Sequence, residues 1–595
     1  MKNAKEIISE FVDNLDVLST PFHEHKISDA VNSFIKERRL DNPPSEWLAE
    51  QIAFSFIPNY SNAETGWGTY YGPMWVMPNG DGMMTESPSI RRVTSEIIDY
   101  WEERSRSAKH PILKLRYADL VWDFSKKVSQ KSPHFSVVHT IIDSTIEIAR
   151  KKSHKYETDV ITKFKRALSL AILINDTQRI ESLRDAIVKY EDEIAEDKKA
   201  GLWGFSFDLL LNNKKVPLGT EIKDKIIWDL ENRLARLADI ESKESLDPWG
   251  AEAAALRLAK YYKSLNQSED AKRVMLKFGV AFETASENAE ALQASAWLQR
   301  VHSLYLENGL PDEADKIAIK IKELGPKVNA GMKSITQEIK ITDKEMTDYV
   351  NAIVDVDFEK TLMRIAIHFV PKKDATEKQL KQLAKKAPIS FLISKQIQDH
   401  EGRPVGFIGS LEDDLIGNIV HQTSQNMHIS SIFLRPVIQE LISRFKPTAE
   451  GIVDYLCQCQ LFSDHKKAML LEGVRAYIDG NHMVAIHILI PQVESAFRMF
   501  VELTGGAVLK PARGGGMYLK TLDELLRDQR VVTVFGEDMP LYFRILLTDQ
   551  RGWNLRNDVC HGISPDIAFV SSVSDRVFHV LLCLSLVRMP KQNES

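Results

Sequence analysis

Residues 482–503 read HMVAIHILIPQVESAFRMFVEL, and two glycines, Gly505 and Gly506, follow shortly after. The stretch predicts one long helix that is closed at the glycines. Pro491 lies inside it and should kink the helix or mark its restart. Four more helices are expected around this one, at about 465–479, 519–528, 540–549 and 565–588. Residues 463–595 are therefore predicted to form a C-terminal helical bundle.

The rest of the chain is also helical in pattern, so the predicted fold class is all-α. An N-terminal helical domain is expected over residues 1–125, with a loop rich in glycine and aromatic residues. A helical-repeat region is expected over residues 126–340. A helical connecting region, residues 341–462, then leads to the bundle.

A weak repeat marks the second of these regions. Leu258-Ala259-x-Tyr261-Tyr262 is followed by Ala271, and Val301-His302-x-Leu304-Tyr305, which starts 43 residues later, is followed by Ala314. Small and aromatic residues at these offsets suit interlocking helix pairs, as in an irregular tetratricopeptide-like solenoid. Such an array either offers a concave surface to a protein partner or trigger, or serves as a rigid spacer or dimerisation arm.

Two further stretches each allow two interpretations. The loop at about residues 66–76 either stacks nucleic-acid bases or packs its rings onto neighbouring helices; its aromatic residues are Trp67, Tyr70, Tyr71 and Trp75. The basic run from Lys378 to Lys386 either faces phosphates or forms a solvated helix face.

Composition limits the possible functions. The chain has 595 residues, a formal net charge of −6, and 44% hydrophobic and 27% charged residues, as in a globular protein of several domains. It has no global basic field, so any RNA site must be a local patch. Four cysteines are too few and too clustered for a disulfide framework, which fits the reducing cytoplasm. The first residues lack the apolar core of a signal peptide, and no apolar run appears long enough to span a bilayer. We therefore expect a cytoplasmic protein with no membrane partner.

The most reactive stretch is Leu555-Arg556-Asn557-Asp558-Val559-Cys560-His561-Gly562. An arginine is a permanent cation that binds phosphate bidentately, and a histidine carries or releases a proton near neutral pH. Arg556 and His561 together suffice for RNA cleavage without a metal. The 2′-OH attacks the adjacent phosphate, the arginine stabilises the developing charge and the histidine moves the proton.

The spacing alone does not single out this pair, because Arg104/His110 and Arg475/His482 also fit it. Three features favour Arg556 and His561. Asn557 adds a polar group, and Gly562 allows a tight turn. Ser564-Pro565 should be the N-cap and first residue of the final helix, so that the pair sits at a helix–turn–helix junction.

Three other residues are candidates for substrate binding. Glu494 and Arg498 are four residues apart, so they either form a plain surface pair or line the bundle interior and orient Arg556. Arg513, beside three glycines, either helps to bind a phosphate through backbone N–H groups or belongs to a flexible linker. No set of histidines and cysteines has the spacing of a metal site, so no metal and no cofactor are expected.

The motif Arg556-Asn557-x-x-x-His561-Gly562 resembles the signature of the domain of unknown function 4209 family, as do the neighbouring Gly536-Glu537-Asp538 and Gly552-x-Asn554-Leu555. Its Arg-polar-x-x-x-His core is similar to that of the larger HEPN group (higher eukaryotes and prokaryotes nucleotide-binding). The resemblance covers about residues 465–590. It implies a helical bundle of a kind that often dimerises. Many members are metal-independent ribonucleases of bacterial toxin and antiphage systems, whereas others bind nucleotides or are scaffolds.

The expected function is thus a metal-independent endoribonuclease that acts on RNA as a homodimer. His561 would be the general acid and base, Arg556 would stabilise the transition state and Asn557 would orient the substrate. The alternative is a non-catalytic HEPN-like scaffold or nucleotide-binding interaction protein. A buried His561 whose ring is hydrogen-bonded within the protein would favour that alternative.

Overall fold

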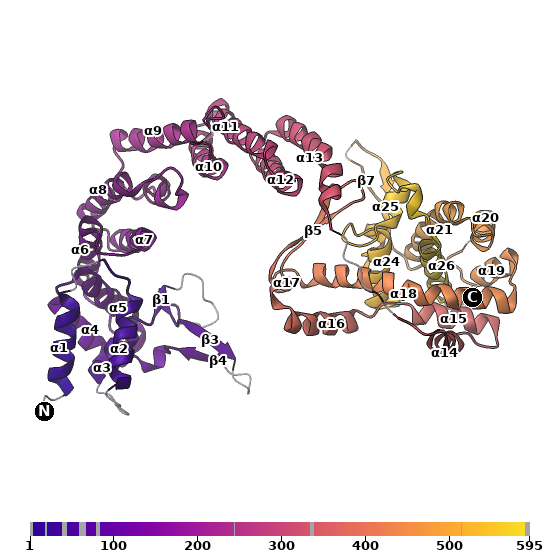
Figure 1. Cartoon of the computed structure of the whole chain (residues 1–595), viewed down its shortest axis with the longest axis horizontal. Helices are drawn as coiled ribbons and strands as arrows, with labels where there is room; N and C mark the ends of the chain where they lie inside the picture. The colour runs from indigo at the N-terminus through magenta and orange to yellow at the C-terminus, as the bar shows by residue number, and fades with distance from the viewer. Residues whose placement is uncertain are drawn as a thin grey trace. The chain divides into compact units, whose positions relative to one another are not determined.

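Helices make up nearly all of the regular structure, which the computed structural model describes for residues 4–17, 21–37, 45–58, 67–78, 84–242, 244–333, 338, 340–462, 464–512 and 514–588 (Figure 1). The strands in these residues are short and form two-stranded antiparallel sheets. The fold class is therefore all-α, as the sequence predicted. The chain forms two compact units, Met1–Ile321 and Lys322–Ser595.

The first unit begins with helices and a small region of strands. Its first elements are α1 (Ala4–Asp16), α2 (His25–Glu37), α3 (Ser45–Ala53), β1 (Ile57–Pro58), β2 (Tyr71–Gly72), β3 (Trp75–Pro78), β4 (Met84–Ser87) and η1 (Ile90–Arg92). Then come α4 (Ser95–Ser107), α5 (Pro111–Ser129), α6 (Ser136–Lys151), α7 (Glu157–Leu173), α8 (Thr177–Ile194), η2 (Ala200–Leu202) and the π-helix η3 (Phe207–Leu211).

Most of the aromatic loop packs onto these helices. Trp67 and Tyr71 are buried. The backbone N–H groups of Tyr70 and Tyr71 donate to the Asp123 carboxylate of α5, at 2.9 and 2.8 Å. The Arg166 guanidinium lies 4.1 Å from the centre of the Tyr70 ring. Trp75 alone of the four predicted aromatics has an exposed fraction near one half, 45%. The packing interpretation therefore fits the first three rings.

The first unit ends in helices, and the two copies of the sequence repeat lie on consecutive pairs of them. The elements are α9 (Thr220–Leu237), α10 (Pro248–Ser264), α11 (Ser268–Glu287), α12 (Ala291–Glu307) and α13 (Pro311–Gly331). The residues of α13 from Lys322 onward belong to the second unit. Equivalent helices of the two pairs begin 43 residues apart: α10 begins at Pro248 and α12 at Ala291, and α11 begins at Ser268 and α13 at Pro311. The pairs interlock at a glycine: a Cβ on Gly279 of α11 would lie 1.7 Å from the Tyr305 hydroxyl of α12.

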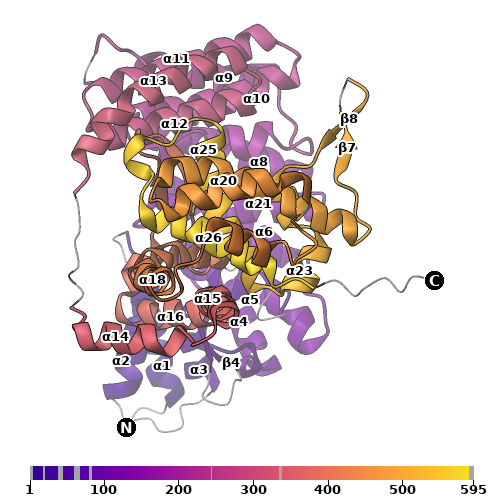
Figure 2. The same cartoon turned by 90° about the vertical axis from the view of Figure 1, so that its right-hand side faces the viewer.

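The second unit is built from many helices and two hairpins. Its first part contains α14 (Asp343–Ile353), α15 (Phe358–His368), α16 (Lys373–Lys386), α17 (Pro388–Leu392), β5 (Lys395–Gln398), β6 (Pro404–Ile408), α18 (Leu415–Phe445) and α19 (Ala449–Leu456). The second part contains η4 (Asp464–Lys466), α20 (Lys467–Ile478), α21 (His482–Leu503), β7 (Leu509–Pro511), β8 (Met517–Leu519), α22 (Leu522–Leu526), α23 (Gln529–Phe535), α24 (Asp538–Leu547), α25 (Leu555–Cys560), η5 (Asp566–Ala568) and α26 (Ser571–Ser585). Figure 2 shows the β7–β8 hairpin projecting from the body of this unit.

One apolar core runs through both parts of the second unit. It contains residues of α15 and α18 together with residues of α21, α24 and α26. Arg576 of α26, in the second part, is fully buried. Its guanidinium donates to two carbonyls of the first part, those of Met427 and Phe369, at 2.9 and 3.3 Å. The boundary expected at residue 463 therefore lies inside a single core rather than between two.

Several expected helix limits differ from the structure. The helix at 482–503 is present with those limits and runs on through Pro491. The final helix begins at Ser571 instead of Pro565, because a short 3-10 turn, η5, occupies the residues after Pro565. The helix expected at 519–528 is present but shorter, as α22 (Leu522–Leu526), and Leu519 is the last residue of strand β8. Among the described residues only α21 is long and apolar enough to cross a bilayer, and most of it is buried in the core, as in core helices that pass the same test.

Candidate functional site

Helix α25 positions the Arg-Asn-x-x-x-His motif. Its buried residues, Leu555 and Val559, hold one side of the helix against the core. Asn554 precedes it in the left-handed conformation, with φ of 50°. His561 caps the other end through its backbone N–H, which donates to the Asn557 carbonyl at 2.9 Å. The motif thus spans one short helix, which follows a left-handed residue, and the turn at its exit.

A buried carboxylate holds Arg556. Glu494 of α21 has only 6% of its surface exposed, and its Oε2 accepts from Arg556 Nε at 2.8 Å. The same carboxylate pairs with Arg498 one helical turn later. A carboxylate between two guanidinium groups fixes their orientation. The structure therefore contains the contact in which Glu494 orients Arg556, one of the two arrangements that the sequence allowed.

Asn557 belongs to a network of amides. Its Oδ1 accepts from Arg556 Nη1 at 3.3 Å. Its Nδ2 donates to Asn554 Oδ1 at 2.7 Å and to the Thr548 carbonyl at 3.4 Å. Asn554 in turn donates to Asp558 Oδ1 at 2.7 Å. The network leaves Asn557 little rotational freedom, and sequence reasoning did not identify Asn554 or Thr548 as its partners.

His561 is exposed, and its ring makes no hydrogen bond to any residue that the structure describes. Gly562 follows it with φ of +65°, so the chain turns away immediately after the ring. A buried and hydrogen-bonded His561 would have favoured a scaffold, but His561 is neither. The ring is accessible to a substrate from solvent.

Arg556 is the second residue of α25, and His561 directly follows the last residue of this helix, Cys560. Successive residues of a helix are about 100° apart, so a separation of five places these two side chains roughly 140° apart. Asn557 shares the side of His561, and Cys560 shares the side of Arg556. Among the described residues, no hydrogen bond joins the guanidinium of Arg556 to the imidazole of His561.

A hairpin from another part of the unit lies near α25. Burial raises the pKa of the Asp558 carboxyl, and the Asn554 hydrogen bond and the nearby charges of His400 and Arg403 oppose that rise. These two residues lie at the tip of the β5–β6 hairpin, which is anchored to α13 because Asn329 Nδ2 donates to the His400 carbonyl at 2.6 Å. No sequence pattern linked this hairpin to the motif.

The two other Arg/His pairs have structural roles. Arg104 and His110 are both buried, and the His110 ring accepts from the Ile112 N–H at the start of α5. Arg475 pairs with Glu450 and Glu472. His482 bonds to the Ser574 hydroxyl at 2.9 Å. Arg513, the remaining substrate-binding candidate, lies outside the described residues.

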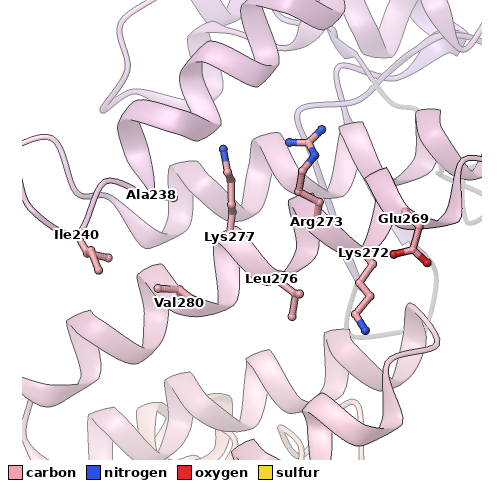
Figure 3. Close-up of a pocket in the computed structure, with 8 residues that line it drawn as sticks. All are labelled: Ala238, Ile240, Glu269, Lys272, Arg273, Leu276, Lys277 and Val280. Carbon is pink, nitrogen blue, oxygen red and sulfur yellow. The ribbon is translucent and has the colours of Figure 1, made fainter.

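An open groove of about 480 Å³ lies in the first unit, between α11 and the residues after α9 (Figure 3). Its apolar lining includes Ile240 and Val280, and its basic lining includes Lys272, Arg273 and Lys277. Arg273 is already bound by Glu231 at 2.6 Å, and Lys272 lies 3.8 Å from Glu313. Two of the three basic side chains of the groove, Lys272 and Arg273, therefore already face carboxylates of the same unit.

Comparison of the chain with family models, with curated proteins and with solved structures found no match. Within the part of the chain that the structure describes, no three histidine, cysteine, aspartate or glutamate side chains are grouped so that they could hold a metal ion. The chemistry that this chain can perform is therefore inferred from the geometry around α25.

Proposed function

We propose that this protein is a metal-independent endoribonuclease of the HEPN type, a toxin or antiphage effector of the cytoplasm. The observation that carries the proposal is the contrast between Arg556, which lies in α25, and His561, which directly follows that helix. His561 is exposed and unbonded among the described residues, whereas Arg556 is partly exposed and held in place by the buried Glu494. A free proton carrier and a fixed phosphate binder are the two groups that this kind of phosphoryl transfer needs.

In the proposed reaction the substrate supplies its own nucleophile. The 2′-oxygen forms a bond to the adjacent phosphorus while the bond from phosphorus to the 5′-oxygen breaks. One imidazole accepts the 2′-OH proton, and an imidazolium donates a proton to the leaving 5′-oxygen. Arg556 stabilises the charge on the phosphorane-like transition state, and Asn557 orients the phosphate. The products are a 2′,3′-cyclic phosphate and a 5′-OH.

On a helix, a separation of five residues places two side chains roughly 140° apart, and this spacing of Arg556 and His561 supports a site shared by two copies. If α25 of a second copy lies alongside, the imidazole of one chain can approach the guanidinium of the other. A homodimer through the second unit is therefore part of the proposal. Light scattering of the full chain should show a dimer at micromolar concentration, and a strictly monomeric protein with full activity would contradict the shared site.

A second candidate has one observation in its favour. Two nitrogens of Arg556 are already occupied, by Glu494 and by Asn557. A guanidinium used in this way can be purely structural, as in a non-catalytic HEPN-like scaffold or nucleotide-binding protein. In that case replacement of His561 would leave every function of the protein intact.

The test is cleavage of single-stranded RNA by the full chain. Wild type should cut RNA in EDTA, leave DNA intact, and yield 2′,3′-cyclic phosphate ends by mass spectrometry. His561→Ala should lose roughly a hundredfold or more in rate, whereas His465→Ala, a change at another exposed histidine of the same unit, should not. Ends with a 5′-phosphate and a 3′-OH, or activity lost in EDTA, would show that the mechanism is wrong.

A further inference from the structure

One segment of the second unit is exposed along almost its whole length. From Lys385 to Ser394 every residue except Phe391 is exposed. The segment includes α17 and three aliphatic side chains that are far more exposed than a core would allow: Ile389 at 71%, Leu392 at 65% and Ile393 at 60%. Several large apolar side chains gathered on a surface usually mark a contact with another body.

The segment is firmly attached to the unit. Helix α16 buries Thr376 and Leu380 and bonds to α18 through Asn426, whose amide donates to Gln379 at 2.8 Å. Phe391 is half-buried under Lys395, whose Nζ lies 5.0 Å from the ring centre. Its carbonyl also accepts from the Leu411 N–H at 2.8 Å. The aliphatic residues are thus presented by a fixed support at one end of the unit (Figure 1).

The surroundings of these aliphatic residues are basic. Residues 378–398 contain five lysines and no aspartate or glutamate. Lys372, Lys373 and Lys381 are paired with Asp538, Glu537 and Glu377. Lys378, Lys385 and Lys386 are exposed and form no ion pair with any residue that the structure describes. Two of these free lysines come directly before the exposed aliphatic residues.

We propose that residues 378–393 form a peripheral docking surface for an anionic lipid bilayer. Unpaired lysines bind the negative headgroups, and Ile389, Leu392 and Ile393 enter the boundary between headgroups and acyl chains. The two contributions together give stable but reversible attachment, which neither gives alone. This is a surface attachment, and it requires no segment that spans the bilayer.

Other occupants fit the segment less well. A symmetric contact between two copies would bring the free lysines of both together, and like charges repel. RNA offers phosphates to lysines, but it binds exposed side chains best through aromatic stacking, and the exposed apolar residues here are aliphatic. The bilayer is the partner that provides both a negative surface and a hydrocarbon layer.

The test is co-sedimentation of the full chain with vesicles of phosphatidylcholine, with and without phosphatidylserine. Wild type should pellet only with the anionic vesicles, and high salt should release it. Lys385→Glu/Lys386→Glu and Ile389→Asp/Leu392→Asp should each weaken binding roughly tenfold or more. The matched controls Lys214→Glu/Lys215→Glu and Ile319→Asp, at exposed positions of the first unit, should bind as wild type does. Far-ultraviolet circular dichroism should show that all variants remain folded.

Three results would overturn the proposal. Wild type that stays in the supernatant with anionic vesicles would exclude the lipid surface. Folded patch variants that pellet as wild type does would place vesicle binding elsewhere on the chain. Patch variants that change the oligomeric state or RNA binding, while vesicle binding is absent, would assign the surface to a second copy or to RNA.

Discussion

Among single residues, Arg556 has the most constrained surroundings. Its Nε faces the buried Glu494 and its Nη1 faces Asn557, so the planar group is fixed before any phosphate arrives. A lysine would keep the charge but has one nitrogen and no plane. It cannot satisfy Glu494 and bind phosphate in the same geometry.

We therefore expect Arg556→Lys to be nearly as damaging as Arg556→Ala, with RNA cleavage reduced by roughly a hundredfold in both. Single-turnover cleavage measures the effect. Arg498→Lys is the control, because Arg498 pairs with the same carboxylate but lies outside α25, and it should cost much less. If Arg556→Lys keeps most of the activity, Arg556 acts only as a general positive charge.

His579 of α26 should make the stability of the folded state depend on pH. It is fully buried and bonded to the Tyr542 hydroxyl at 2.8 Å, and burial lowers the pKa of its imidazole to about 3. The unfolded chain binds this proton near pH 6.5, about the ordinary pKa of histidine. Between pH 3 and pH 6.5 the unfolded state therefore binds more protons at this histidine than the folded state does. The free energy of unfolding consequently decreases as the pH falls below about 6.5.

At pH 5 this one residue should cost about 2 kcal/mol relative to neutral pH. Hydrogen exchange of the α26 amides, corrected for the intrinsic exchange rate, measures the loss of protection. His579→Asn keeps a donor and an acceptor but does not titrate, so the difference in protection between pH 7.5 and pH 5 should shrink by that amount. An unchanged difference would show that another group causes the acid sensitivity.

At the scale of elements, the contact between α13 and the β5–β6 hairpin depends on two glycines. A Cβ on Gly325 would lie 2.1 Å from the Glu401 carbonyl oxygen, and one on Gly402 would lie 2.1 Å from that of Gly325. Gly402 also has φ of +77°. Both obstacles are backbone atoms, so a side chain can be accommodated only if the hairpin moves.

Gly325→Ala should therefore loosen the hairpin whose tip lies near Asp558. We expect the amides of residues 395–408 to exchange roughly tenfold or more faster, as for an overpacked contact. Gly331→Ala, in the same helix with nothing within 4 Å of the added carbon, is the matched control. Equal exchange in the two variants would show that the contact does not hold the hairpin.

The elements also show what the sequence can and cannot predict. The limits of α21 were predictable because its apolar run is long and ends at glycines. The start of α26 was not, because Ser564-Pro565 has the pattern of a helix start, whereas α26 begins after Val570 without a side-chain cap. One visible signal was missed: Thr521 and Glu524 form a capping box that begins α22.

The site was predictable only in part, for a similar reason. Arg556, Asn557 and His561 are close in the sequence, so chemistry and spacing pointed to them. Contacts between distant segments, such as the Thr548 carbonyl on Asn557 or His400 near Asp558, depend on how the helices pack. No short pattern encodes that packing.

At the scale of the whole molecule, the single core of the second unit has a consequence for fragments. Residues 463–595 carry the whole motif, but their apolar faces are covered by α15 and α18. Expressed alone, this fragment should aggregate or lack cooperative unfolding, because it exposes core side chains. Residues 322–595 should fold, with cooperative loss of circular dichroism in urea. A well-folded 463–595 fragment would show that residues 341–462 are dispensable.

The exposure of the cysteines has a practical consequence. Cys560 is exposed, whereas Cys457 is half-buried and Cys459 and Cys583 are buried. Partial desolvation of its sulfur nevertheless raises the pKa of the Cys560 thiol. A maleimide dye should therefore attach to it slowly at neutral pH and faster in mild alkali. Cys560 lies one helical turn from Arg556. The wild-type chain thus provides its own position for a fluorescent reporter, which can follow the arrival of a nucleotide, an RNA or a second copy at α25 in real time.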